Sequence, residues 1–204
     1  DINLKKNKYS EAIMSYEKAL YYFIKNNNKE KIFECYLNIG KIYMKEEFYK
    51  GAILQFNFAE TLLNKIHIDD LDIYKDLYSR ISYCYIKIDN NEKSLRYINK
   101  IEEIDVKNNK EEELYTLMLK ANSLLNMGQF ERSKEYFKKI LEILDKEKNK
   151  TELSSIYLTI CEIYKNIGNL DKVLEYSQKV YDMKKNDEDE YMMKSLFRII
   201  ETYM

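Results

Sequence analysis

Apolar residues recur along this chain at every third or fourth position, which is the period of an amphipathic helix. Residues 36–43 and 47–59 show this period on either side of a short polar turn, and we expect two helices that pack against each other. The residues that carry the pattern are Tyr36, Ile39, Gly40 and Tyr43 in the first helix, and Tyr49, Ala52, Phe56 and Ala59 in the second.

The same helix pair recurs along the whole chain. One residue near the start of each second helix marks the repeat, and consecutive markers are separated by 40, 42, 39 and 40 residues. A near-fixed period of this length is typical of a solenoid of stacked helix pairs. The markers are Ala12, Ala52, Ser94, Ser133 and Val173.

Polar stretches between the repeats set the predicted boundaries of one repeat array over residues 1–204. The predicted units are residues 1–28, 29–68, 69–108, 109–149 and 150–186, followed by a lone first helix over 191–204. We interpret residues 1–6 as the tail of another first helix. Terminal repeats of a solenoid usually carry polar capping surfaces, and these do not. We therefore expect a fragment of a larger protein or a chain that docks on another, for example a homodimer through the terminal helices.

Each first helix carries a small residue at the same place in the pattern. A large side chain there would hold the two helices of a pair apart, so the small residue marks their closest approach. The residues at this place are Gly40, Ser82, Ala121 and Cys161.

Composition supports long helices and excludes some classes of partner. The chain has no proline and four glycines, so the punctuation of many short strands is missing. Its formal net charge of −1 provides no broad positive surface for nucleic acid or an anionic membrane. No apolar run reaches the roughly 18 residues of a membrane span and no signal peptide is present. Three dispersed cysteines, Cys35, Cys84 and Cys161, are expected to be buried reduced thiols in a cytoplasmic protein.

No residue pattern predicts catalysis, a metal site or a cofactor. His67 is the single histidine, and no cysteine or serine motif accompanies it. Asp69 and Asp70 are the only local residues that could join it around a metal ion. A glycine-rich phosphate loop is absent from the sequence. We expect a binding protein rather than an enzyme.

The repeat pattern resembles the tetratricopeptide repeat (TPR) family over essentially the entire chain. The resemblance implies an all-α fold, a right-handed α-solenoid of about five helix pairs. The period near 40 exceeds the family's usual value of about 34, and the family's proline after the second helix is absent, so longer helices or loops are implied. HEAT-like helix pairs share the longer period and are the alternative fold. The resemblance is most complete at Gly40, Tyr43, Tyr49, Ala52, Phe56 and Ala59.

In TPR-like arrays the first helix of each pair lines the inner surface. If Tyr36, Gly40 and Tyr43 face the second helix, the residues one or two steps around the first helix form the lining. The same offset in the later repeats selects the remaining candidates. The predicted peptide-binding residues are Asn38, Lys41, Arg80, Tyr83, Tyr115, Asn122, Glu162 and Arg198.

Two residue types in this set suit an extended peptide. The amides of Asn38 and Asn122 can donate to a peptide carbonyl and accept from a peptide N–H, whatever the peptide's side chains. The guanidinium groups of Arg80 and Arg198 can bind a carboxylate, including a peptide C-terminus, through two parallel hydrogen bonds.

The period near 40 also resembles the Rap and PlcR type of bacterial peptide-pheromone receptors. That resemblance implies the sensory part of a transcriptional regulator in quorum sensing, with any DNA-binding or effector domain outside these residues. The alternative is a scaffold or co-chaperone that clamps a partner's acidic C-terminal tail. Asn38 and Arg80 match two positions of that clamp, whereas Asp76 stands where a lysine is expected and Asp1 where an asparagine is expected.

Overall fold

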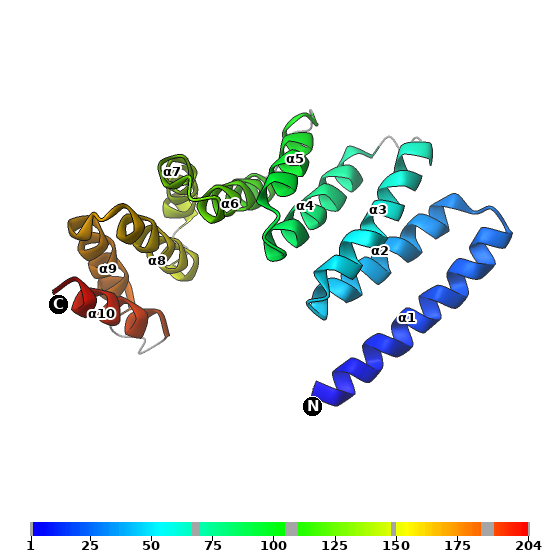
Figure 1. Cartoon of the computed structure of the whole chain (residues 1–204), viewed down its shortest axis with the longest axis horizontal. Coiled ribbons are helices and arrows are strands. Elements are labelled where there is room, and N and C mark those ends of the chain that lie inside the picture. The colour runs from blue at the N-terminus through cyan, green and yellow to red at the C-terminus, as the bar shows by residue number, and fades with distance from the viewer. Residues whose placement is uncertain (1, 67–69, 105–109, 148–149, 185–189, 204) are drawn as a thin grey trace. The chain divides into compact units, whose positions relative to one another are not determined.

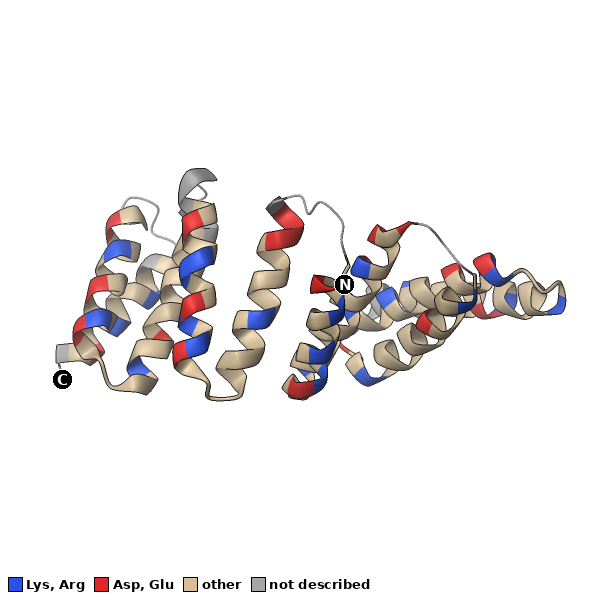
Figure 2. Cartoon of the chain, turned by 90° about the horizontal axis from the view of Figure 1, so that it is seen from above, with Lys and Arg blue, Asp and Glu red and all other residues tan. Residues whose placement is uncertain are grey.

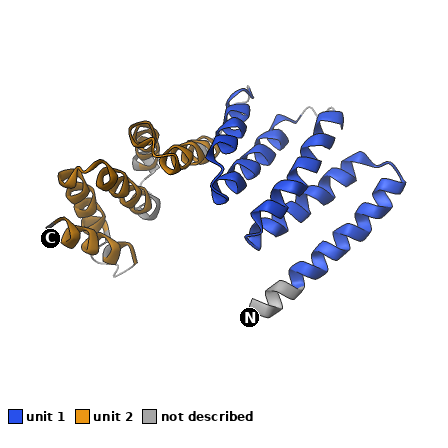
Figure 3. Ribbon diagram, in the orientation of Figure 1, with its two compact units in different colours: residues 1–107 blue, residues 108–204 orange. Residues whose placement is uncertain are grey.

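The computed structural model describes residues 2–66, 70–104, 110–147, 150–184 and 190–203, and this part of the chain forms ten α-helices without a strand (Figure 1). The predicted all-α fold of helix pairs is confirmed. The chain divides into two compact units, residues 1–107 and 108–204, which are described separately (Figure 3). None of the described helices combines the length and the apolar character needed to cross a bilayer.

Unit 1 contains two complete helix pairs preceded by one long helix. Its helices are α1 (Ile2–Lys25), α2 (Lys29–Lys45), α3 (Tyr49–Ile66), α4 (Leu71–Lys87) and α5 (Asn91–Glu102). The first helices α2 and α4 pack on the second helices α3 and α5, while α1 packs on α2 and α3 on α4. The interpretation of residues 1–6 as a separate first helix was wrong, because residues 2–6 continue into the helix that carries Ala12. No glycine or proline interrupts that stretch, so nothing ends the helix there.

Unit 2 repeats the arrangement with two pairs and a final first helix. Its helices are α6 (Lys110–Asn126), α7 (Phe130–Glu147), α8 (Lys150–Ile167), α9 (Leu170–Lys184) and α10 (Glu190–Tyr203). The first helices α6 and α8 pack on the second helices α7 and α9, α7 packs on α8, and α10 packs mainly on α9.

Every helix pair turns on one residue in the left-handed backbone region. This residue is a glycine in unit 2, Gly128 at φ 70° and Gly168 at φ 80°, but Glu47 and Asp89 in unit 1, both at φ 58°. In all four turns the next backbone N–H donates to a first-helix carbonyl five residues back, at 2.8–2.9 Å. This bond satisfies a carbonyl that the end of the helix would leave without a partner.

The small first-helix residues lie where prediction placed them. A Cβ atom added to Gly40 would lie 2.4 Å from a ring carbon of Phe56, so α2 and α3 approach too closely for a side chain. In the later pairs a small residue of the first helix meets a small residue of the second. These contacts are Ser82 Oγ to Ser94 Oγ at 2.8 Å, Ser133 Oγ to the Ala121 carbonyl at 2.8 Å, and Cys161 Sγ to Ser177 Oγ at 3.4 Å.

Each unit has its own apolar core between first and second helices. The rings of Phe56 in α3 and Phe137 in α7 occupy equivalent places and are almost inaccessible to solvent. All three cysteines are buried and free, as predicted from their apolar surroundings. The cores fix the rotation of the first helices, and thereby decide which of their side chains remain at the surface.

Candidate functional site

The packed face of α2 identifies its exposed face. The Tyr36 ring lies 5.2 Å from that of Phe58 in α3, and Gly40 lies against Phe56. Asn38 and Lys41 stand on the neighbouring stripe and are half-buried. Acidic and basic residues are interspersed along the helices of both units, so the faces differ in how charges are paired and not in gross charge (Figure 2).

Arg80 of α4 is bound by Asp76, one helical turn earlier. Arg80 Nε donates to Asp76 Oδ2 at 2.9 Å, and a terminal nitrogen of the guanidinium lies 2.8 Å from Asp76 Oδ1. This two-point contact is the geometry by which arginine recognises a carboxylate. Both side chains stay partly exposed, 31% for Arg80 and 46% for Asp76. The arginine predicted to bind a ligand carboxylate thus already contacts a carboxylate of its own helix.

Lys41 of α2 lies close enough to α4 to experience the charges of Arg80 and Asp76. Burial lowers the pKa of Lys41, the positive charge of Arg80 lowers it further, and Asp76 acts in the opposite direction. The structure therefore brings Lys41 and Arg80 together as neighbouring cations on adjacent first helices. Asp76 offsets their repulsion only in part, since the influence of Arg80 on Lys41 is the larger.

Tyr83 forms a partly buried wall beside these cations. Its ring meets that of Tyr49 in α3 edge to face, with centroids 6.2 Å apart, and Lys87 Nζ lies 5.3 Å from its centre. Burial, followed by the proximity of Tyr83, raises the pKa of the Tyr49 hydroxyl. Tyr83 is therefore held by the second helix of the preceding pair, which leaves only part of its ring at the surface.

The two predicted asparagines occupy comparable places in different units. Asn38 of α2 and Asn122 of α6 are half-buried, and their side-chain amides make no hydrogen bond within the described part of the chain. Tyr115, also on α6, has 41% of its surface exposed. Tyr115 and Asn122 are seven residues apart, two helical turns, and so lie on one side of α6.

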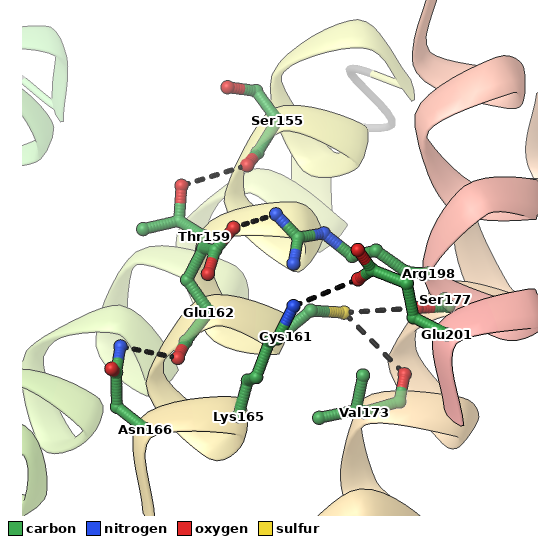
Figure 4. Close-up of polar contacts among 10 residues, drawn as sticks. All are labelled: Ser155, Thr159, Cys161, Glu162, Lys165, Asn166, Val173, Ser177, Arg198 and Glu201. Carbon is green, nitrogen blue, oxygen red and sulfur yellow. Dashed lines mark hydrogen bonds and ion pairs between the residues drawn. The ribbon is translucent and has the colours of Figure 1, made fainter. Parts of the chain in front are cut away.

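Two ion pairs connect α8 to α10 in unit 2 (Figure 4). The Arg198 guanidinium contacts the Glu162 carboxylate, and Lys165 Nζ lies 2.9 Å from Glu201 Oε2. Only 18% of the Arg198 side chain is exposed, against 47% of Glu162. Lys165 lowers the pKa of Glu201 by a hydrogen bond and by its charge. Two of the predicted binding residues, Glu162 and Arg198, thus bind each other.

Prediction missed a tyrosine–lysine cluster in unit 1, formed by Tyr78 and Tyr85 of α4 with Tyr97 and Lys100 of α5. Tyr97 stacks on Tyr85 at 5.9 Å and lies 5.7 Å from Tyr78, while Lys100 Nζ lies 4.6 Å from the Tyr97 centroid. Glu60 of α3 accepts from the Tyr97 hydroxyl at 2.9 Å and pairs with Lys100 at 2.7 Å. Burial and then Glu60 raise the pKa of Tyr97.

Unit 2 contains a matching tyrosine–lysine cluster, in which Tyr176 of α9 stacks on Tyr164 at 5.8 Å and lies 5.6 Å from Tyr157. Lys179 Nζ lies 4.5 Å from the Tyr176 centroid, but its acid is Glu175 of the same helix, at 2.8 Å. Each member of this cluster stands 79 residues after its counterpart in unit 1. That double-repeat offset was the signal in the sequence that could have revealed both clusters.

The remaining chemical predictions are only partly accessible. His67 and Asp69 lie outside the described residues. Among the described residues, no three side chains of the His, Cys, Asp or Glu type gather as metal ligands would. The candidate site is therefore the surface of the first helices, which offers amides, guanidinium groups, a lysine and tyrosine rings for binding.

Comparison with known proteins supports the helix-pair pattern independently. Residues 114–143, which span most of α6 and α7, match the model of the tetratricopeptide repeat family. The fold is that of a TPR array. No curated protein matches the sequence significantly.

Solved TPR structures resemble the chain in fold at low sequence identity. RapI in its apo form has 18% identity and a TM-score of 0.72, with 83% of this chain and 62% of RapI covered. A STAND signal-transduction ATPase from Pyrococcus horikoshii with a TPR sensor has 22% identity and a TM-score of 0.70, with 92% and 28% covered.

The Rap conjugation gene regulator of plasmid pLS20, in complex with the Phr* peptide, has 18% identity and a TM-score of 0.67, with 87% of this chain and 49% of that chain covered. The chain thus spans less than two thirds of RapI, of the ATPase and of this regulator. At these identities the likeness shows a shared TPR fold.

Proposed function

We propose that this chain binds a peptide or a segment of a partner protein on the faces of its first helices, and that it is the ligand-binding part of a bacterial transcriptional regulator of the peptide-pheromone receptor type. Two of the three solved structures above are Rap proteins, one of them in complex with a peptide. That similarity supports the receptor assignment. A cytoplasmic location and a homodimer through the terminal helices remain predictions.

The observation that carries peptide binding is the state of Asn38 and Asn122. Each is a half-buried amide on a first helix, and neither hydrogen-bonds another described residue. An asparagine amide so placed can form a donor and an acceptor bond with one peptide unit. Because these bonds go to the backbone, they hold a peptide without prescribing its sequence.

The alternative, a clamp for an acidic C-terminal tail, has less support. Asp76 stands at the position of a clamp lysine and forms a two-point contact with Arg80. An acidic tail would meet a like charge at Asp76 and would have to compete for Arg80. We therefore favour a peptide receptor over a co-chaperone.

Peptide display tests the proposal directly. The immobilised chain is used to select from random peptides of about six to ten residues, and calorimetry then measures the affinity of the enriched sequence. We expect saturable binding with one peptide per chain. Asn38→Ala and Asn122→Ala should each weaken it roughly tenfold, the value of one lost hydrogen bond of about 1.4 kcal/mol.

Asn99→Ala is the matched control, because Asn99 is an exposed asparagine on the second helix α5. This variant should bind the peptide as the wild type does. The proposal is wrong if no peptide is enriched, or if the Asn38, Asn122 and Asn99 variants all bind with the wild-type affinity.

A further inference from the structure

The first helices of unit 1 place two cations side by side on a partly exposed surface. Lys41 of α2 is half-buried, and Arg80 of α4 has 31% of its side chain exposed. They come from different helix pairs, so the packing of α3 between them brings them together. Holding like charges together in a half-buried place is unfavourable unless a counter-charge is supplied.

The counter-charge within the chain is Asp76, and it is held only from one side. Asp76 bonds Arg80 in an i,i+4 pair on the surface of α4, with 46% of its own side chain exposed. Exposed pairs of this kind stabilise a helix by only about 0.3–0.5 kcal/mol. Asp76 can therefore leave Arg80 at little cost when another carboxylate arrives.

We infer that Arg80 and Lys41 form a binding site for the carboxylate of a bound peptide, and that Asp76 competes with this carboxylate for Arg80. A ligand carboxylate placed between the two cations accepts bonds from both helices, whereas Asp76 bonds Arg80 from α4. The inference rests on the proposed function for the source of the carboxylate, a peptide C-terminus or an acidic side chain. Asp76 then sets the affinity, and the site selects acidic ligands only when they outcompete it.

The pairing of charges in unit 2 shows that this arrangement is not a general feature of the first helices. There the cations of α8 and α10 each face an anion of the other helix, as Arg198 does Glu162 and Lys165 does Glu201. The field around Lys41 agrees with the difference, because Arg80 lowers the pKa of Lys41 more than Asp76 raises it.

Titration with succinate, a small dicarboxylate, tests the site without any peptide. Side-chain NMR signals of labelled lysine and arginine report binding at Lys41 and Arg80 in the full chain. We expect weak binding by the wild type and about tenfold tighter binding by Asp76→Asn, because the internal competitor is gone. Arg80→Gln and Lys41→Gln, each combined with Asp76→Asn, should abolish the gain.

Asp72→Asn is the control for net charge, since Asp72 is exposed and lies one turn before Asp76 on α4. It removes the same charge without freeing Arg80, and succinate should bind it as weakly as the wild type. The inference is overturned if Asp76→Asn gains no affinity, or if Asp72→Asn gains as much.

The peptide enriched by display separates this inference from the proposed function. Three forms are compared: the free acid, the C-terminal amide, and a form with each acidic side chain replaced by its amide. If one amidation weakens binding and Asp76→Asn strengthens binding of the acid, the carboxylate's source is identified and the inference holds. If all forms bind equally, peptide binding stands and the carboxylate site is wrong. If no peptide is enriched but succinate binds as described, the site stands and the peptide receptor is wrong.

Discussion

Units 1 and 2 are built from the same packing but arrange their charges differently. Both stack helix pairs through small residues and a buried phenylalanine, and both contain a tyrosine–lysine cluster. In unit 1 the lysine of that cluster finds its acid, Glu60, on the preceding pair, and the first helices bring two cations together. In unit 2 the equivalent lysine uses Glu175 of its own helix, and the first helices are joined by opposite charges.

The comparison shows that repetition constrains the interior far more than the surface. A core position must suit the second helix that covers it, so its size and polarity repeat. A surface position has only its neighbours to satisfy, so charge can vary between units. Variation in that layer is where a ligand preference can be encoded, and unit 1 is the more selective of the two faces in this scheme.

Truncating the core phenylalanines should have the largest effect and should be equal in the two units. Phe56→Ala and Phe137→Ala each remove a ring that is at most 1% exposed. We expect each to lower the free energy of unfolding by about 3–5 kcal/mol. Urea denaturation measures the loss, with the leucine variants as substitutes if the alanine variants do not fold. A difference of more than about 2 kcal/mol between the two sites would contradict equivalent packing.

The interior was also the part that the sequence predicted well. Periodicity located the helix pairs, because a buried face leaves a regular record of apolar and small residues such as Gly40 and Ala52. The face of the first helices followed from the same rotation. Which side chains on that face bind each other did not follow, because Glu162 and Arg198 are 36 residues apart and meet through the packing of α9.

Removing one hydroxyl from each tyrosine–lysine cluster should distinguish the units. Tyr97→Phe deletes the bond from Tyr97 to Glu60, and we expect a loss of about 1–2 kcal/mol because the acceptor is charged and mostly buried. Tyr176→Phe should change stability by less than about 0.5 kcal/mol, since the Tyr176 hydroxyl makes no hydrogen bond to any described residue. Equal losses in thermal denaturation would show that Glu60 contributes nothing specific.

The turns between first and second helices offer a test with opposite signs. Glu47 adopts φ 58°, where a side chain is strained, so Glu47→Gly should raise stability by about 0.5–1 kcal/mol. Gly168 adopts φ 80° in the equivalent turn, so Gly168→Ala should lower stability by about 1 kcal/mol. Chemical denaturation of both variants decides the matter. A loss of stability in Glu47→Gly would mean that the glutamate compensates for its strain by contacts of its own.

Neutralising the acid partner of each arginine should cost more in unit 2. Glu162→Gln leaves the largely buried Arg198 with a weaker acceptor, and we expect a loss of about 1 kcal/mol. Asp76→Asn breaks an exposed pair within one helix and should cost no more than about 0.5 kcal/mol. The free energies of unfolding in urea at low salt provide the comparison. If Asp76→Asn proves the more costly, Asp76 is a structural residue of α4 and not a displaceable one.

The pKa of Lys41 provides the finest measure of the contrast between the two faces. Arg80 lowers this pKa and Asp76 raises it, so Arg80→Gln should raise it, since the repelling charge goes and the attracting charge stays. Arg96→Gln removes an arginine exposed on α5 and serves as the control, with no change expected at Lys41. NMR titration of the lysine side-chain carbons resolves the individual residue. An unchanged pKa in Arg80→Gln would mean that burial alone acts on Lys41, and that the two cations do not share a site.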